Sequence, residues 1–261
     1  MTKERQSNRA ARAVASKRRA RPPRSERRLV VEGHRVVLEA IAAGRALEVL
    51  APRRGQDREV LTAAEAAGVP IRIVEDGDRE EVSVRVELHP ELSERELSER
   101  NYRDDAIVIV LDGITDPQNL GAAARSAEAA GAELLVTRDR RAAPTTAAAI
   151  RASAGALFHL PLARVANIPR VIARLQEAGF TAIGLDERAE TSIYERPAPE
   201  GRVAIVVGAE DRGLSRLVRE RCDVLVELPM GGRVSSLNAS AALSAALFGF
   251  VLPSRSGRSA G

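Results

Sequence analysis

The stretch AIVIVLD, residues 106 to 112, decides the fold class of the second half of the chain. It is an almost continuous apolar run of strand length, as expected where a parallel sheet buries a strand on both faces. Downstream of it, helical and strand-like patterns alternate, which predicts an α/β domain with a mainly parallel sheet. We expect helices near 119 to 130, 145 to 154, 168 to 178, 214 to 221 and 237 to 251, and strands near 133 to 137, 157 to 160, 180 to 185, 203 to 207 and 224 to 228. The ligand site of such a sheet lies beyond the carboxyl ends of its strands.

Upstream, residues 29 to 90 have the pattern of a smaller α/β module. The segment VEGHRVVLEAIAAG, 31 to 44, carries apolar residues at helical spacing and ends at a glycine. A short strand is expected at 46 to 50, a second helix at 57 to 68 and a second strand at 70 to 74. Apolar and polar residues then alternate as they do in a half-buried strand, with Val82, Val84, Val86 and Leu88 as the apolar set.

Three further segments complete the predicted organisation. The charged stretch ELSERELSERNYRDD, 91 to 105, shows no strong apolar face and is predicted to be a linker to a second domain at 106 to 252. Residues 1 to 28 hold eleven Lys or Arg and two Glu, a net charge of +9, which leaves −5 for the rest of a chain of net charge +4. We expect a disordered arm suited to RNA phosphates, with a solubilising tail or a transit peptide as alternatives. Residues 253 to 261 are expected to be a disordered tail.

The composition excludes several classes of protein. The single cysteine, Cys222, excludes an internal disulfide, and three scattered histidines give no zinc-binding spacing. No apolar run approaches the roughly 18 residues that are needed to span a bilayer. We therefore expect a cytoplasmic protein that uses no metal and does not associate with a membrane.

Three loops that follow predicted strands carry the unusual residues. DGITDPQNLGAAARSAEAAG, 112 to 131, places a turn before Asn119 and carries Arg125 nearly two helical turns later. VGAEDRGL, 207 to 214, has glycines on both sides of Glu210, and LPMGGRVSSLNAS, 228 to 240, sets glycines beside small hydroxyl and amide side chains. Taken singly, these residues also have ordinary explanations: helix caps for Asn119, Ser236 and Asn238, and turn residues for Gly208 and Gly213. Glu210 could hold its loop by pairing with an arginine, within the chain or across a dimer, without touching substrate.

Common nucleotide-binding and hydrolase motifs are missing from the sequence. It has no G-x-G-x-x-G fingerprint, no Walker-type GK[ST], no G-x-S-x-G elbow and no H-E-x-x-H helix. The usual dinucleotide, nucleoside-triphosphate and hydrolase interpretations therefore lose their main support.

The three loops together resemble the ordered motifs of a known family. NLGAAAR (119 to 125), VGAEDRGL (207 to 214) and LPMGGRVSSLNAS (228 to 240) are similar to the motifs of the SpoU family, RNA ribose 2′-O-methyltransferases of the SPOUT superfamily. The resemblance covers about 106 to 252. VEGHRVVLEAIAAGRALEVL is similar to the small L30e-like RNA-binding domain that precedes the catalytic domain in one branch. DGITDPQNLGAAARSAEAAGA is similar to the branch that acts on a guanosine of 23S rRNA.

The resemblance implies a cofactor, a topology and an assembly. It implies S-adenosylmethionine as methyl donor, a C-terminal trefoil knot, and a homodimer with its active site near the interface. The implied partner is RNA, either 23S rRNA or a large-subunit precursor. The implied catalytic residues are Asn119, Arg125, Glu210, Ser236 and Asn238, and the implied cofactor-binding residues are Gly208, Leu228, Met230, Ser236, Leu237 and Asn238.

Elementary chemistry explains why this set needs no metal ion. S-adenosylmethionine brings its own electrophile, so the protein need only position the acceptor hydroxyl, exclude water and favour loss of the proton. A guanidinium pKa above about 12 argues against Arg125 as the general base. We expect Arg125 to hold a phosphate or to stabilise a developing alkoxide.

Several features leave the target open. Asn238-Ala239-Ser240 stands where relatives commonly have Asn-Val-Ser, Gly249 where they often have Glu, and no His-Gln-Gly segment ends the N-terminal module. Three hypotheses remain: methylation of a 23S rRNA guanosine, the same chemistry on tRNA or on an antibiotic-contacting rRNA nucleotide, and a non-catalytic RNA-binding or ribosome-assembly protein. The sequence identifies neither the nucleotide nor the general base.

Overall fold

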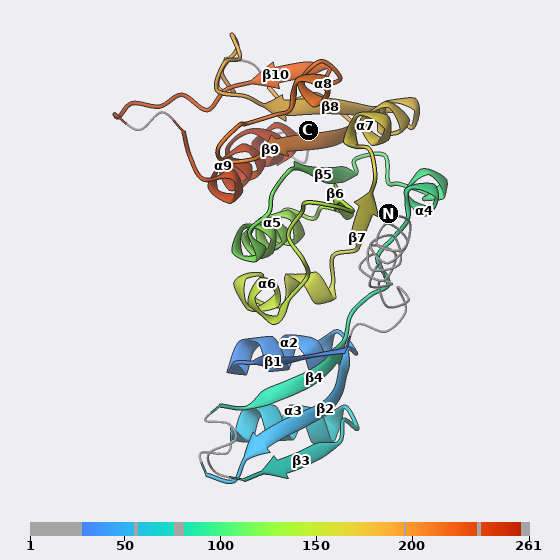
Figure 1. Ribbon diagram of the computed structural model, residues 1–261, viewed down its shortest axis with the longest axis vertical. Coiled ribbons are helices and arrows are strands. Elements are labelled where there is room, and N and C mark those ends of the chain that lie inside the picture. The colour runs from blue at the N-terminus through green and yellow to red at the C-terminus, as the bar shows by residue number, and fades with distance from the viewer. Residues whose placement is uncertain (1–27, 55–56, 76–80, 196, 234–235, 257–261) are drawn as a thin grey trace, which may run out of the picture.

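The computed structural model describes residues 28–54, 57–75, 81–195, 197–233 and 236–256, and in it the chain forms two sheets that follow one another along the long axis of the molecule (Figure 1). The predicted basic arm lies outside these residues except for Arg28, which begins the first strand. No helix in the described ranges is long and apolar enough to cross a bilayer.

The N-terminal module is a four-stranded sheet with two helices. Its strands are β1 (Arg28–Glu32), β2 (Ala46–Pro52), β3 (Ile71–Val74) and β4 (Ser83–Glu87), arranged in the order β1-β4-β2-β3. β4 runs antiparallel to both neighbours, while β2 and β3 are parallel. The helices are α2 (His34–Ala42) and α3 (Arg58–Ala66), and the Asp57 side chain caps α3 by accepting from the amide of Val60.

The apolar residues of this module fall where their periodicity placed them. The predicted alternation at 82 to 88 is confirmed, because all four apolar side chains are buried: Val82, Val84, Val86 and Leu88. The helix expected from residue 31 begins only at His34, because Val31 and Glu32 pair with Val84 and Ser83 as part of β1. Only one residue separates this strand from the helix, so apolar residues of the strand also fitted the helical spacing.

The C-terminal module is a six-stranded, entirely parallel sheet. Its strand order is β10-β8-β9-β5-β6-β7, and every neighbouring pair is parallel. The strands are β5 (Ile107–Asp112), β6 (Leu134–Arg138), β7 (Leu162–Val165), β8 (Phe180–Leu185), β9 (Arg202–Gly208) and β10 (Val224–Val226). All six residues of β5 are buried, as predicted for a strand covered on both faces.

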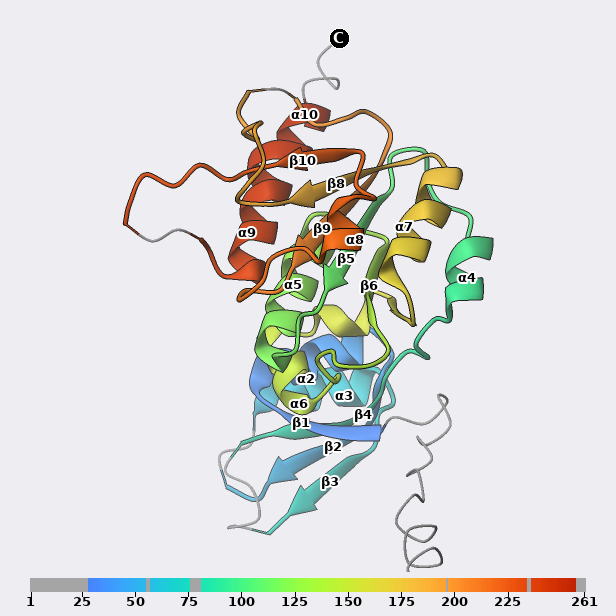
Figure 2. The same cartoon turned by 45° about the horizontal axis from the view of Figure 1, so that its top comes forward.

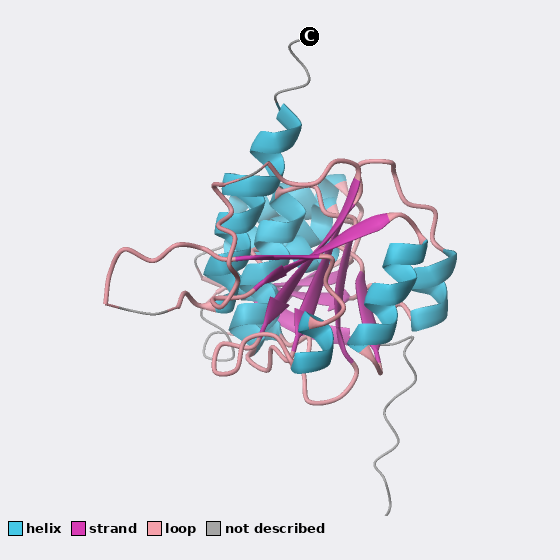
Figure 3. Ribbon diagram, turned by 90° about the horizontal axis from the view of Figure 1, so that it is seen from above, coloured by secondary structure: helices cyan, strands magenta, loops and turns pink. Residues whose placement is uncertain are grey.

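Helices cover both faces of this sheet (Figure 3). Ile107, Ile109 and Leu111 of β5 belong to a core shared with helices α5 (Pro117–Ala129) and α9 (Ala239–Ala246). Val108 and Val110 belong to a second core with α7 (Ile168–Glu177), α8 (Arg216–Arg219) and the short helix α4 (Glu94–Glu99). The remaining helical segments are α6 (Ala147–Ala152), the 3₁₀ helix η1 (Ala156–Phe158), the π-helical segment η2 (Leu247–Val251) and α10 (Leu252–Ser256).

Residues 157 to 160 were expected to form a strand, and that expectation is wrong. Ala156–Phe158 forms a 3₁₀ turn, and the strand is β7 at Leu162–Val165. The strand contains Arg164, which is only 3% exposed and whose Nε donates to Glu91 Oε1 at 2.7 Å. A buried charge inside the strand breaks its apolar pattern, so the neighbouring apolar run looked more strand-like than the strand itself.

The segment predicted to be a linker is partly structured and packs on the second domain. The amide of Leu92 donates to the carbonyl of Leu162, and a capping box of Ser93 and Glu96 starts α4. Leu97 on that helix is 1% exposed in the second core. Two leucines among many charged residues form too weak an apolar pattern to reveal this packing.

At the other end of the domain, residues 252–256 are helical rather than disordered, and 257–261 lie outside the described residues.

The two modules pack closely against each other. One apolar cluster runs from Val37 and Ala40 of the first to Leu157 and Phe158 of the second. Gly155 lies at this contact with φ +92°, and a Cβ built on it would lie 2.5 Å from Cβ of Glu39. Glu39 also accepts a hydrogen bond from His159 at 3.1 Å.

Candidate active site

The carboxyl ends of β5 and β9 define the candidate site. These two strands are neighbours, with Asp112 opposite Gly208, and the strand order reverses there: β6 and β7 lie on one side, β8 and β10 on the other. Ligands of open α/β sheets bind at such a switch point. The first two loops singled out in the sequence leave the sheet at this position.

Three side chains from the three loops meet in an amide–carboxylate cluster, made of Asn119, Glu210 and Asn238. The Asn238 amide nitrogen lies 2.9 Å from Asn119 Oδ1 and 2.9 Å from Glu210 Oε1. The Asn119 amide nitrogen donates to the same Glu210 oxygen. The cluster thus joins two neutral amides to one carboxylate oxygen.

Local structure fixes each member of the cluster. Asp116 caps α5 by accepting from the amide of Gln118, and Pro117 occupies its first turn, so Asn119 lies in that turn. Asn238 caps α9 in its turn, because its Oδ1 accepts from the Ser240 amide at 2.9 Å and from Ser240 Oγ at 2.6 Å. Asn238 therefore does both: its side-chain oxygen caps the helix, and its side-chain nitrogen donates to the cluster.

The loop that carries Glu210 is held tightly at its base. Ala209 and Gly213 exchange backbone hydrogen bonds of 3.1 and 2.7 Å, which closes a short hairpin with Glu210 in it. Gly208 allows this closure, because a Cβ on it would lie 2.0 Å from the carbonyl carbon of Gly213. Beneath the loop, the buried Asp112 accepts from the Ser215 amide at 2.9 Å and from Arg138 Nε at 3.0 Å.

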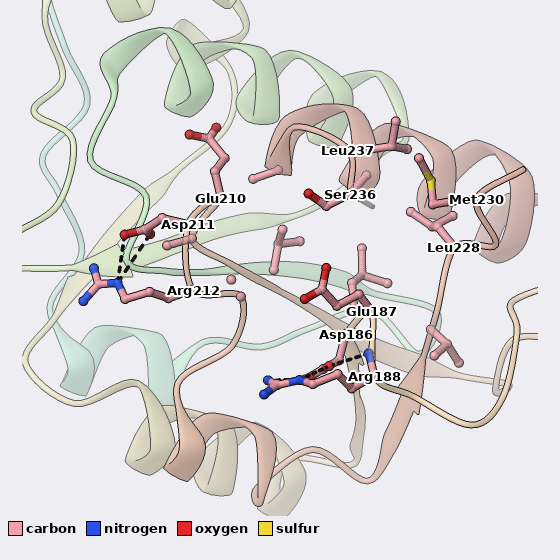
Figure 4. Close-up of a pocket in the computed structure, with 18 residues that line it drawn as sticks. Asp186, Glu187, Arg188, Glu210, Asp211, Arg212, Leu228, Met230, Ser236 and Leu237 are labelled. Carbon is pink, nitrogen blue, oxygen red and sulfur yellow. Dashed lines mark hydrogen bonds and ion pairs between the residues drawn. The ribbon is translucent and has the colours of Figure 1, made fainter. Parts of the chain in front are cut away.

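A pocket adjoins the cluster on the β8 side of the switch point (Figure 4). It encloses about 880 Å³, open space at its mouth included. Its walls are the ends of β8, β9 and β10, the Glu210 loop, the segment leading to α9 and the first turns of α9 itself. They comprise Leu185, Asp186, Glu187, Arg188, Val207, Gly208, Ala209, Glu210, Asp211, Arg212, Gly213, Val226, Leu228, Met230, Ser236, Leu237, Ala239 and Ala242.

Most of the residues predicted to bind a cofactor line this pocket: Gly208, Leu228, Met230, Ser236 and Leu237. Asn238 does not line it, but contacts Glu210, which does. Ser236 lines the pocket and has no recorded contact with the cluster within the described ranges. Ser235, the other serine of the motif, falls outside those ranges.

Arg125 stands apart from the other predicted catalytic residues. It lies on α5 six residues after Asn119, which places the two side chains on different faces of the helix. Its side chain is exposed, and in the part of the chain that the structure describes it makes no contact with the cluster. The structure of one chain therefore brings together three of the five predicted catalytic residues in direct contact.

The sequence interpretation missed the acidic residues that follow β8. Asp186 and Glu187 both line the pocket, and Asp186 is only 5% exposed. Arg188 Nε lies 3.2 Å from Asp186 Oδ1, and this hydrogen bond raises the pKa of the guanidinium. The rule that located the other loops would have found these residues, because they follow a buried parallel strand directly.

No group of three or more His, Cys, Asp or Glu side chains with metal-binding geometry occurs among the described residues.

Comparison with known proteins identifies the domain that holds this site. Residues 106–248 match the model of the SpoU rRNA Methylase family. The chain belongs to this family.

Individual members of the SpoU family are similar to the chain over part or all of its length. The 23S rRNA (guanosine-2′-O-)-methyltransferase RlmB of Salmonella typhi is 43% identical over 145 residues, which are 56% of this chain and 59% of the relative. RlmB of Vibrio cholerae serotype O1 is 41% identical over 165 residues, 63% of this chain and 66% of the relative. The match thus spans about three fifths of the curated relatives' length.

A solved SpoU structure is similar over nearly the whole chain. It is the SpoU methyltransferase AviRb from Streptomyces viridochromogenes in complex with the cofactor AdoMet. It superposes with a TM-score of 0.76 at 25% sequence identity and covers 96% of this chain and 97% of its own. The α/β architecture with a mainly parallel sheet is therefore that of a SpoU methyltransferase.

Proposed function

We propose that the protein transfers a methyl group from S-adenosylmethionine to a ribose 2′-hydroxyl of RNA, with a guanosine of 23S rRNA as the target. The observation that carries the proposal is the meeting of Asn119, Glu210 and Asn238 at the mouth of a pocket. Family membership and the names of the two relatives support the reaction and the target.

The pocket residues fit S-adenosylmethionine. The apolar side chains of Val226, Leu228 and Leu237 offer surface to an adenine ring, and Glu187 and Glu210 offer negative charge to a cation. When bound, this cofactor supplies an electrophilic methyl group on a sulfonium.

The cluster residues are the ones placed to orient the acceptor hydroxyl and to favour loss of its proton. The two amides hold Glu210 Oε1, which fixes the carboxylate at the pocket mouth. We propose that Asn119 orients the ribose hydroxyl, while the neighbouring carboxylate favours removal of its proton. Ser236, on the pocket wall, is proposed to bind the cofactor and to help position the hydroxyl.

Arg125 is proposed to bind an RNA phosphate next to the target ribose. Its side chain is exposed, and a guanidinium can donate two parallel hydrogen bonds to a phosphate, so Arg125 is suited to fix the RNA backbone. We further propose a homodimer in the cytoplasm, a trefoil knot at the C-terminus and an L30e-like RNA-binding role for the N-terminal module. The return of α9 from the edge strand β10 to α5 and β9 at the centre of the sheet supports the knot.

Methyl transfer from labelled S-adenosylmethionine to unmodified rRNA and tRNA tests the proposal, with the product nucleosides resolved by mass spectrometry. We expect 2′-O-methylguanosine in 23S rRNA only, and none with Asn119→Ala. Label in tRNA alone would contradict the target but keep the chemistry. If no RNA or ribosomal particle is labelled and calorimetry detects no S-adenosylmethionine binding, the protein is a non-catalytic RNA-binding protein and the proposal is wrong.

A further inference from the structure

Glu187 lies in the pocket but has no part in the amide–carboxylate cluster. It follows β8 by two residues, and its side chain is exposed to the cavity. Figure 4 shows its carboxylate turned into the pocket, on the side of Ser236. The neighbouring Asp186 instead points to Arg188.

Most of the other charges of the pocket wall are paired. Four carboxylates and two guanidiniums line it. Asp186 is neutralised by Arg188 at 3.2 Å and by Arg219 at 3.0 Å, and Asp211 lies 3.2 Å from Arg212. Of the carboxylates that line the pocket, only Glu187 and Glu210 form no ion pair among the described residues, although the charge of Glu187 also acts on the adjacent Arg188.

The two remaining carboxylates differ in what they contact. Glu210 Oε1 already accepts hydrogen bonds from two amides, so its position is fixed by the cluster. Glu187 has no hydrogen-bond or ion-pair partner in the described ranges, and apolar side chains such as Leu228 share its wall. A free carboxylate beside apolar surface attracts a positive ligand more strongly than one surrounded by water.

We propose that Glu187 is the specificity-determining residue that makes the pocket prefer the cationic methyl donor over its neutral product. The inference rests on the proposed function, because it takes S-adenosylmethionine as the ligand. In methyl transfer the new O–CH₃ bond replaces the S–CH₃ bond, and the hydroxyl loses its proton. The sulfonium thereby becomes the neutral thioether of S-adenosylhomocysteine. Donor and product differ by one methyl group and one positive charge, so a carboxylate in the pocket distinguishes them by charge.

This preference has a functional consequence. A pocket that bound donor and product equally would hold product as often as donor whenever the two concentrations were similar. With Glu187 in place, the attraction ends when the charge is lost, which favours release of the product. The same negative charge also opposes entry of an RNA phosphate into the pocket.

Isothermal titration calorimetry on the full-length protein tests the proposal with S-adenosylmethionine and S-adenosylhomocysteine as separate ligands. Glu187→Gln keeps the size of the side chain and removes its charge. We expect it to weaken S-adenosylmethionine binding about five- to tenfold and to change S-adenosylhomocysteine binding less than about twofold. Glu190→Gln is the matched control, because Glu190 is exposed in the same loop and does not line the pocket.

The outcomes separate this inference from the proposed function. If Glu187→Gln weakens both ligands equally, or neither, while the wild-type protein binds both and methylates RNA, charge discrimination by Glu187 is wrong and the proposed function stands. If the wild-type protein binds neither ligand, both fail together. A selective loss for S-adenosylmethionine that shrinks as salt is raised supports the inference, because screening weakens only the charge term.

Discussion

The two sheets of the protein differ in where their loops go. In the four-stranded mixed sheet, β1, β2 and β3 run one way and β4 runs the other, so the chain leaves β4 at the end opposite to the loops after β1, β2 and β3. In the six-stranded sheet every pair is parallel, and the loops after β5, β9 and β10 gather on one side (Figure 2). Asn119 and Asn238 meet there although 119 residues separate them. Parallel pairing, more than any single motif, therefore places the candidate active site.

Glycine serves the two regions in different ways. At the site, Gly208 lets two backbone segments touch, whereas at the contact between the modules Gly155 lets the backbone touch the Glu39 side chain. Changes at Gly208 should therefore disturb the site, and changes at Gly155 should disturb the packing of the modules while leaving the pocket intact. Four predictions, in order of decreasing effect, test this separation.

Replacing Gly208 by alanine should have the largest effect. The added Cβ would lie 2.0 Å from a carbonyl carbon and 2.3 Å from the Leu214 nitrogen, and backbone atoms at both positions cannot move aside cheaply. We expect a loss of about 3 kcal/mol or more in the free energy of unfolding, measured by urea denaturation. Gly249→Ala is the control, because no heavy atom lies within 4 Å of its added Cβ. Equal midpoints for the two variants would contradict the account of the Glu210 loop.

Replacing Asn119 by alanine should come next and should act on turnover alone. The change removes one amide from Glu210 but leaves the 2.9 Å contact between Asn238 and Glu210. We expect kcat to fall about 100-fold or more, which corresponds to about 2.7 kcal/mol of transition-state stabilisation. Affinity for S-adenosylmethionine should stay within about twofold. The neighbouring Gln118→Ala serves as control, and an equal loss of turnover in that variant would sink the assignment.

Gly155→Ala should destabilise the protein by about 2 kcal/mol without changing cofactor binding. The substitution has two destabilising effects: an alanine is strained at a φ of +92°, and its Cβ would lie 2.5 Å from Cβ of Glu39. Gly179→Ala measures the backbone strain alone, because Gly179 has φ +85° and open space around it. Urea denaturation should show the larger loss for Gly155→Ala, and calorimetry should give wild-type cofactor affinity for both. A weakened cofactor affinity in Gly155→Ala would break the separation between the two regions.

The smallest effect concerns Cys222, which precedes β10 and packs against the second core. Burial raises the pKa of its thiol to about 12, so in the folded protein the thiol stays protonated at pH 8 to 10. The unfolded thiol ionises near about 8.5, so this group lowers stability as pH rises above that value. We expect iodoacetamide at pH 8.5 to modify native protein far more slowly than urea-unfolded protein. Rapid alkylation of the native form with methyl transfer intact would show that the thiol is not protected.

The predictions from sequence were best where one local pattern matched one element. The strand expected at 180 to 185 is β8 as observed, and the apolar run at 106 to 112 became the buried β5. They failed where a polar residue is buried by distant partners, as with Arg164 in β7 beside Glu91. They also failed for Leu97, an apolar residue buried within a charged segment that looked like a linker.

The sequence by itself determined the alternating α/β order, the SpoU motifs and the identity of the residues in the three loops. These are properties of neighbours along the chain, which periodicity and motif spacing describe directly. Only the tertiary structure decided that Asn119, Glu210 and Asn238 share hydrogen bonds, that Arg125 stands apart, and that Glu187 is the pocket carboxylate that lies in neither an ion pair nor the cluster among the described residues. The reason is physical: such contacts depend on which strands pair and in what order, and pairing is set by packing across the whole sheet.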